Sequence, residues 1–147
     1  MRKYITTMLI DATPMTKGEY VRYKGGNLLN YKNTSQKGYC IKYPDGHEAW
    51  EDKKWFEMIA RSADDGMSFG MALELLKQGC KLKRKGWNGK DQFLVYIDPY
   101  NNEQFKLIEE APLGTFYGYV AIKTNYNAIV PWLPSCTDML AEDWILA

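Results

Sequence analysis

Residues 67–97 decide the fold of the larger half of this chain, and they read Met67-Ser-Phe-Gly-Met-Ala-Leu-Glu-Leu-Leu-Lys-Gln-Gly79, Cys80-Lys-Leu-Lys-Arg84, Lys85-Gly-Trp-Asn-Gly-Lys90 and Asp91-Gln-Phe-Leu-Val-Tyr-Ile97. Ser68 suits an N-cap and Gly79 a C-terminal cap, so a helix of about ten residues is predicted between them. Its apolar stripe is expected to be Phe69, Ala72, Leu73 and Leu76. The two alternating runs that follow predict antiparallel strands joined by the turn at residues 85–90.

The residues after this core predict more strands. A third strand is expected at 116–123, a turn at 125–127 leads into residues 128–132, and 98–114 is expected to be a long loop. Residues 135–138 are expected to cap one helical turn at 139–141, and a last strand is expected at 143–146.

The residues before the core predict a second, smaller module. A strand is expected at 4–12, a helix with the capping-box spacing of Thr16 and Glu19, a hairpin around Pro44-Asp45-Gly46, and a helix at 51–61. Trp55, Met58 and Ile59 are predicted to share one face of that last helix. The polar stretch 62–66 separates the modules 1–65 and 66–147. The predicted class is α+β, with short helices packed on mostly antiparallel strands.

Composition excludes several classes of protein. The 147 residues are 46% hydrophobic and 25% charged, which is typical of a globular chain and not of a disordered one. The net charge of +1 argues against a general duplex-DNA binder. The chain has no apolar run of the roughly 18 residues that span a bilayer, and its start does not resemble a secretion signal.

The sequence offers little for metal binding or nucleophilic catalysis. The spacing of Cys40, Cys80 and Cys136 fits neither a disulfide framework nor a zinc motif, and free thiols suit a reducing cytoplasm. His47 is the only histidine and is expected in a surface turn. No cofactor or catalytic residue is therefore predicted.

A basic run at residues 81–90 is the first candidate for ligand binding. Alternation places Lys81, Lys83 and Lys85 on one side of the strand and Arg84 on the other. This run could be a solvated strand edge protected by lysines. It could instead bind phosphate, because Arg84 presents a planar fork and the nearby glycines let backbone amides approach an anion. Trp87 in the turn should pack on something, either a neighbouring subunit or a nucleotide base.

The second candidate is the stiff segment Pro131-Trp132-Leu133-Pro134-Ser135-Cys136-Thr137-Asp138. Two prolines around Trp132 restrict the backbone, which lowers the entropy cost of recognising a ligand. Ser135 and Asp138 could do no more than cap the following turn. Thr137 and Asp138 could instead bond ribose hydroxyls or a base edge.

The blocks Met67–Gly79, Arg84–Lys90 and Val130–Trp144 together resemble a phage domain whose members include the Thoeris anti-defence protein 2 family. The resemblance covers residues 67–147. It implies a sponge that binds cyclic ADP-ribose isomers made by TIR-domain proteins, and in some members CBASS cyclic dinucleotides, without cleaving them. It also implies a homo-oligomer, with a tetramer expected and ligand pockets at subunit junctions, in the cytoplasm of the infected bacterium.

The resemblance suggests a role for each candidate residue. Arg84 and Lys85 would hold a pyrophosphate, and Trp87 or Trp132 would stack on adenine. Asn88, Thr137 and Asp138 would form hydrogen bonds to the riboses, and Ser135 would belong to the same ligand-binding group. No nucleic acid polymer, membrane or metal is expected as a partner. Two alternatives stay open, namely a hydrolase of cyclic nucleotides and a protein that blocks a host defence factor. Residues 1–64 resemble a second phage module to which no activity is assigned.

Overall fold

The computed structural model describes residues 2–3, 6–89, 91–98 and 117–147. The chain divides into two compact units, Met1–Arg61 and Ser62–Ala147. The division lies four residues before the sequence-based boundary at 65/66. Backbone pairing gives the reason, because the Leu146 amide donates to the Ala63 carbonyl at 3.1 Å and so attaches residue 63 to the second unit.

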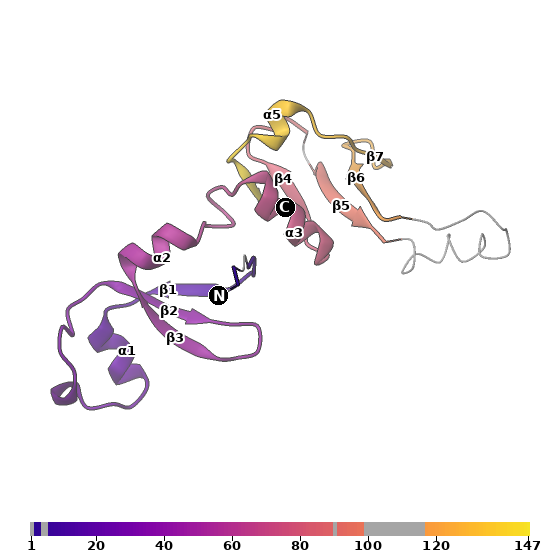
Figure 1. The fold of residues 1–147 in the computed structure, drawn as a ribbon. Coiled ribbons are helices and arrows are strands. Elements are labelled where there is room, and N and C mark those ends of the chain that lie inside the picture. Colours follow the sequence, from indigo (N-terminus) through magenta and orange to yellow (C-terminus); the bar gives the residue numbers. More distant parts are fainter. Residues whose placement is uncertain (1, 4–5, 90, 99–116) are drawn as a thin grey trace, which may run out of the picture. The chain divides into compact units, whose positions relative to one another are not determined.

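The first unit is a three-stranded antiparallel sheet in the order β1-β2-β3 with short helices (Figure 1). Its elements in chain order are β1 (Asp11–Pro14), α1 (Lys17–Tyr23), the 3-10 helix η1 (Leu28–Asn30), β2 (Gly38–Lys42), β3 (Glu48–Asp52) and α2 (Lys53–Ile59). The capping box of Thr16 and Glu19 is present, and Gly46 in the hairpin turn has a φ of 84°. The predicted first helix and the hairpin are confirmed.

The first strand differs from its prediction at 4–12. Only Asp11 to Pro14 pair with β2, from Asp11 opposite Lys42 to Pro14 opposite Tyr39. The β2–β3 hairpin turns just beyond Lys42, so the described residues 6–10 have no strand beside them. Residues 4 and 5 lie outside the described residues.

Helix α2 begins later than its predicted start at residue 51, because Asp52 is its N-cap and accepts hydrogen bonds from the amides of Lys54 and Trp55. The predicted apolar face is not packed within its unit. Trp55, Met58 and Ile59 are all more than half exposed.

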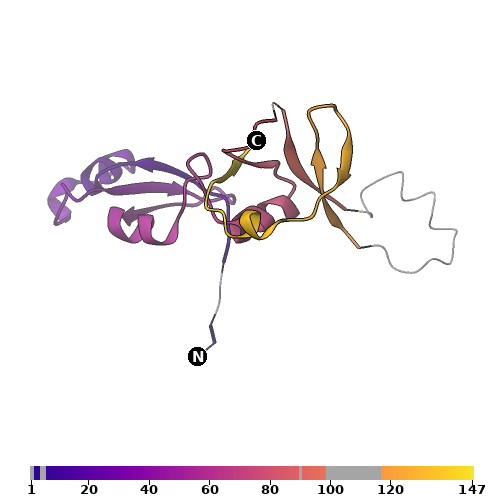
Figure 2. The same cartoon turned by 90° about the horizontal axis from the view of Figure 1, so that it is seen from above.

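The second unit is a five-stranded antiparallel sheet in the order β7-β6-β5-β4-β8. Its elements are α3 (Phe69–Lys77), β4 (Leu82–Arg84), β5 (Phe93–Ile97), β6 (Tyr119–Lys123), β7 (Ile129–Pro131), α5 (Cys136–Met139) and β8 (Trp144–Leu146). Figure 2 shows the strands of this sheet from above. The α+β class is confirmed, while the predicted loop at 98–114 falls, apart from residue 98, outside the described residues.

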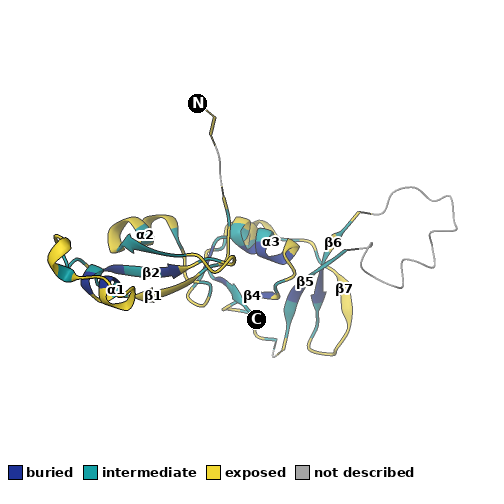
Figure 3. Cartoon of the chain, turned by 90° about the horizontal axis from the view of Figure 1, so that it is seen from below, coloured by how far each residue is buried: buried dark blue, intermediate teal, exposed yellow. Residues whose placement is uncertain are grey.

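One face of this sheet carries the core of the second unit. Helix α3 packs there, and the buried side chains that it shares with the strands are Met67, Ala72, Leu75, Leu76, Leu82, Leu94, Ile122 and Trp144. Figure 3 shows buried residues on α3 and β4. Leu75 takes the buried position predicted for Leu73, which is only partly buried.

Helix α5 starts three residues before the predicted turn at 139–141. Ser135 is its N-cap, and a capping box with Asp138 closes the first turn on residues 136–139 themselves. Among the described residues, no helix is both long and apolar enough to cross a bilayer.

Candidate functional site

Arg84 joins three separate parts of the second unit. It ends β4, and its Nε donates to Asp143 Oδ1 at 2.8 Å while its Nη1 donates to Asp138 Oδ1 at 3.0 Å. Asp138 belongs to α5, and Asp143 directly precedes β8. The guanidinium that was predicted to hold a pyrophosphate is therefore engaged by two carboxylates of its own unit.

Asp138 uses both carboxylate oxygens within the unit. Oδ2 accepts from the Ser135 hydroxyl at 2.6 Å and from the Ser135 amide at 3.0 Å, while Oδ1 accepts from Arg84. The Asp138 carbonyl accepts from the indole Nε1 of the buried Trp144 at 3.0 Å. The capping role that the sequence allowed for Ser135 and Asp138 is thus present, and their ribose contacts remain predictions.

These contacts favour the ionised form of both carboxyl groups. Burial opposes ionisation of Asp138, but the hydrogen bonds from Ser135 and Arg84 outweigh it and hold the pKa of Asp138 below its usual value. The hydrogen bond from Arg84 lowers the pKa of Asp143 in the same way. The two carboxylates in turn raise the pKa of Arg84. The cluster carries one positive and two negative charges.

Trp87 and Trp132 lie in one aromatic cluster with Phe69 and Trp144. Trp87 meets Trp144 edge-on at 5.6 Å between ring centroids, and it meets Trp132 at 6.3 Å. Trp132 lies 5.9 Å from Trp144 and 6.1 Å from Phe69. Trp87 therefore packs on the core of its own unit, and both indoles are only partly exposed. The contact of Trp87 with a neighbouring subunit or a nucleotide base remains a prediction.

The remaining predicted residues lie around this cluster. Lys85 Nζ donates to the Asp65 carbonyl at 2.7 Å, which attaches the turn after β4 to the start of the unit. Asn88 and Thr137 are exposed, and the Thr137 hydroxyl lies 2.8 Å from that of Ser135. The structure thus brings Arg84, Ser135, Thr137 and Asp138 into one connected group, with exposed polar groups at its margin.

Sequence reasoning missed Asp143, Trp144 and Phe69 as parts of this group. Phe69 was recognised only as an apolar position of a helix, although it contacts two tryptophans. Asp143 is expected from the sequence only as the first residue of the last strand, at 143–146. The available signal was alternation, because Asp143 directly precedes the strand whose first residue is the fully buried Trp144.

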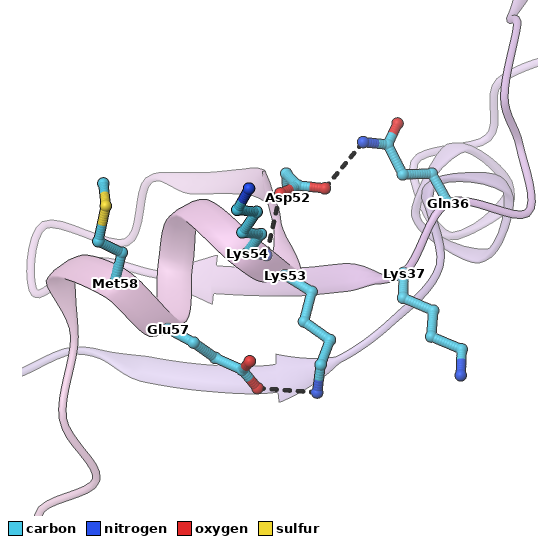
Figure 4. A pocket seen from close by; sticks show the side chains of 7 residues that line it. All are labelled: Gln36, Lys37, Asp52, Lys53, Lys54, Glu57 and Met58. Carbon is cyan, nitrogen blue, oxygen red and sulfur yellow. Dashed lines mark hydrogen bonds and ion pairs between the residues drawn. The ribbon is translucent and has the colours of Figure 1, made fainter.

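The first unit contains a shallow hollow of about 540 Å³ (Figure 4). It is lined by Gln36, Lys37, Asp52, Lys53, Lys54, Glu57 and Met58. Both acids are already engaged, since Gln36 donates to Asp52 at 2.8 Å and Lys53 pairs with Glu57 at 2.8 Å. No sequence prediction concerned this hollow. Across the described ranges, no group of three or more His, Cys, Asp or Glu side chains is arranged to hold a metal ion.

Comparison with known proteins covers the second unit. Residues 67–147 match the family described as Tad2-like, the Thoeris anti-defense 2-like domain. The chain belongs to this family. The chain is also 46% identical over 81 residues to Thoeris anti-defense 2 of Bacillus phage SP01, an alignment that covers 53% of this chain and 91% of that relative. The resemblance inferred from the three sequence blocks is confirmed.

The Tad2-like match runs from Met67, the residue before the N-cap of α3, through β8. It therefore includes the Arg84 cluster, the aromatic cluster and every candidate ligand residue. Residues 1–61, which form the other unit, lie outside the match. Membership of the Tad2-like family supports a phage anti-defence role for this chain.

Proposed function

We propose that this chain protects a phage by binding cyclic nucleotide immune signals and holding them uncleaved in the cytoplasm of the infected bacterium. The ligands proposed are cyclic ADP-ribose isomers made by TIR-domain proteins, and cyclic dinucleotides of the CBASS type. The proposal rests mainly on how much of the relative is aligned, because the 81 aligned residues span 91% of a protein named Thoeris anti-defense 2. The Tad2-like unit alone thus corresponds to nearly all of that relative.

The geometry of the unit supports binding by a rigid wall. Trp132 lies between Pro131 and Pro134 and packs edge-on against the fully buried Trp144, so its ring is fixed before any ligand arrives. Exposed hydroxyl and amide groups at Thr137 and Asn88 suit the polar groups of a sugar. Because Arg84 is already paired, it supports the binding wall by positioning Asp138.

Homo-oligomer formation, with a tetramer as the expected state, is part of the proposal. Large apolar side chains on the second unit remain exposed in the single chain, namely Tyr117, Tyr126, Ile129, Leu133 and Leu140. Exposed apolar surface of this kind is often covered by another copy of the same chain. Light scattering at micromolar concentration should therefore give more than one chain per particle.

The experiment is recovery of the ligand after incubation. The full chain is mixed with a panel of cyclic ADP-ribose isomers and cyclic dinucleotides, separated from free nucleotide, heated, and analysed by mass spectrometry. Intact ligand released by heat supports sequestration. A cleaved product would instead indicate a hydrolase, and recovery of no nucleotide from any incubation would contradict the proposal and favour a protein target.

Thermal shift measures the preference within the same panel. A ligand that binds only the folded state raises the free energy of unfolding by RT ln(1 + [L]/Kd), so the tightest ligand gives the largest shift at equal concentration. Thr137→Ala should reduce that shift, because it removes an exposed hydroxyl of the candidate group. Asn125→Ala, an exposed turn position outside the candidate group, serves as the matched control.

A further inference from the structure

The sheet of the second unit has a row of side chains that crosses all five strands on the face opposite α3. Phe93 of β5 pairs directly with Lys123 of β6, which pairs in turn with Ile129 of β7. Leu82 is opposite Leu94, so the next pair along that antiparallel ladder places Lys83 of β4 beside Phe93. Lys83 also pairs with Ile145 of β8. The centre of the row is therefore Lys83, Phe93 and Lys123.

A third lysine belongs to the same group. Lys81 Nζ lies 4.9 Å from the centroid of the Phe93 ring, and Lys123 Nζ lies 5.6 Å from it. We call Lys81, Lys83, Phe93 and Lys123 the basic sheet face. Alternation along β4 explains the grouping, since Lys81 and Lys83 share one side while Leu82 points into the core on the other.

The basic sheet face lacks acidic partners among the residues that the structure describes. None of its three lysines forms an ion pair there, and the one hydrogen bond, from Lys123 to the Asp91 carbonyl at 3.3 Å, goes to a neutral group. Arg84, one residue after Lys83, points to the other side and is neutralised by two carboxylates. Arg84 on one side of β4 is thus paired with carboxylates, while Lys81 and Lys83 on the other side have no acidic partner among the described residues.

Neighbouring uncompensated ammonium groups favour an anion. Lys83 and Lys123 are two strand spacings apart, about 10 Å between backbones, and their long side chains can converge over Phe93. Lysine ammoniums bind phosphate as compact point charges, and an aromatic ring between them offers a surface for a base. Val95 of β5 continues the face as a partly buried apolar side chain.

We infer that the basic sheet face binds the phosphates of a small phosphorylated ligand, a nucleotide with two phosphate groups. This inference rests on the proposed function and places an anion site on the face of the sheet opposite α3, away from the Arg84 cluster where the sequence predicted it. Lys83 and Lys123 hold the phosphates, and Phe93 lies between the two lysines in the row, where its ring can contact the base. The ligand is a small molecule, because the net charge of the chain is only +1 and the cations form one local group.

The test uses the full chain and two probes, cyclic ADP-ribose and cyclic di-GMP, with affinity measured by calorimetry. Lys83→Gln and Lys123→Gln each remove one charge and should each weaken binding at least about tenfold, with a shallower dependence on salt. Lys77→Gln is the matched control, because Lys77 lies on α3 away from this face and pairs with Glu74. Its affinity should stay within about twofold of the parent.

Inorganic pyrophosphate, followed by amide shifts in NMR, tests the basic sheet face independently of sequestration. Shifts at residues 81–83, 93 and 123 that vanish in the double variant Lys83→Gln/Lys123→Gln support the inference. If the parent binds a cyclic nucleotide and the double variant binds it equally well, the inference fails while the sequestration proposal stands. If the parent binds neither cyclic nucleotide but shows the pyrophosphate shifts, the sequestration proposal fails and the site stands. Tighter binding of a short RNA than of either nucleotide would overturn the assignment to a small ligand.

Discussion

Arg84 Nη1 lies 3.0 Å from Asp138 Oδ1, although 54 residues separate the two in the chain. The pair connects the end of β4 to the capping box of α5, and the same guanidinium holds Asp143 beside β8. The stiff segment that carries Trp132 leads directly into this cap. The ion pair therefore fixes one end of the segment that we propose as the binding wall.

Loss of this guanidinium should destabilise the second unit. Arg84→Ala leaves Asp138 and Asp143 partly buried without their cation, and we expect a loss of about 1–3 kcal/mol in the free energy of unfolding. Arg84→Lys should recover only part of it, because one ammonium cannot contact both carboxylates in the same geometry. Urea unfolding measures both variants.

Lys85→Ala is the control for this change, since Lys85 is exposed and bonds mainly a backbone carbonyl. It should unfold close to the parent. An Arg84→Ala variant as stable as Lys85→Ala would show that the cluster contributes nothing measurable.

Acid should weaken the same cluster. The folded-state pKa values of Asp138 and Asp143 are lowered, so their contribution is complete above the unfolded value of about 3.9 and is lost as pH falls through the folded values. We expect the unfolding free energy of the parent to fall below about pH 4 more steeply than that of Asp143→Asn. Parallel urea titrations from pH 6 to pH 3 give the comparison, and identical slopes would contradict it.

Trp87 should behave as a core residue as well as a site residue. It contacts Trp132 and Trp144, so Trp87→Ala should cost about 3 kcal/mol or more of stability, while Trp87→Phe keeps part of the packing and should cost less. Differential scanning calorimetry measures the change. Trp55→Ala, at a position 52% exposed in the other unit, should cost less than about 1 kcal/mol.

Two glycines should respond to alanine in opposite directions. Gly38 lies against the Trp50 ring and the Glu51 carbonyl, so an added methyl group clashes, and Gly38→Ala should lose about 1–3 kcal/mol. Gly70 lies within α3, and the nearest atom to an added methyl group is Ser68 Oγ at 3.9 Å. Gly70→Ala should gain about 0.5–1 kcal/mol through helix propensity. Melting curves of the two variants should shift in opposite directions.

The sequence predicted those elements whose signals are local. Thr16 and Glu19 lie three residues apart, and Pro44-Asp45-Gly46 is itself the turn, so the chain around them needs no distant partner to be recognised. The strand at 4–12 was placed too early because its limits depend on β2, about 30 residues away, and not on its own β-branched residues. Strand limits are set by the partner strand.

The candidate site was predicted only in part for the same reason. Residue types indicate Arg84, Ser135 and Asp138 as candidate polar groups, but alternation along one strand cannot show that the partner of Arg84 lies on α5. The sequence cannot show that Trp87 packs on the core of its own unit, because its aromatic neighbours Trp132 and Trp144 come from distant segments. Lys83 and Lys123 could be grouped only once the strand order was known.

The Met67 amide donates to the Trp144 carbonyl at 2.8 Å, and the Trp144 amide donates to the Met67 carbonyl at 3.2 Å. The first residue of the Tad2-like unit and its last strand are therefore held side by side. A unit closed in this way can be transferred between chains as a whole. It can be joined to a preceding module such as residues 1–61 through a few residues without opening its sheet, and the same closed unit can occur in chains of different length. Grafting residues 62–147 behind an unrelated domain should therefore carry the anti-defence activity with it.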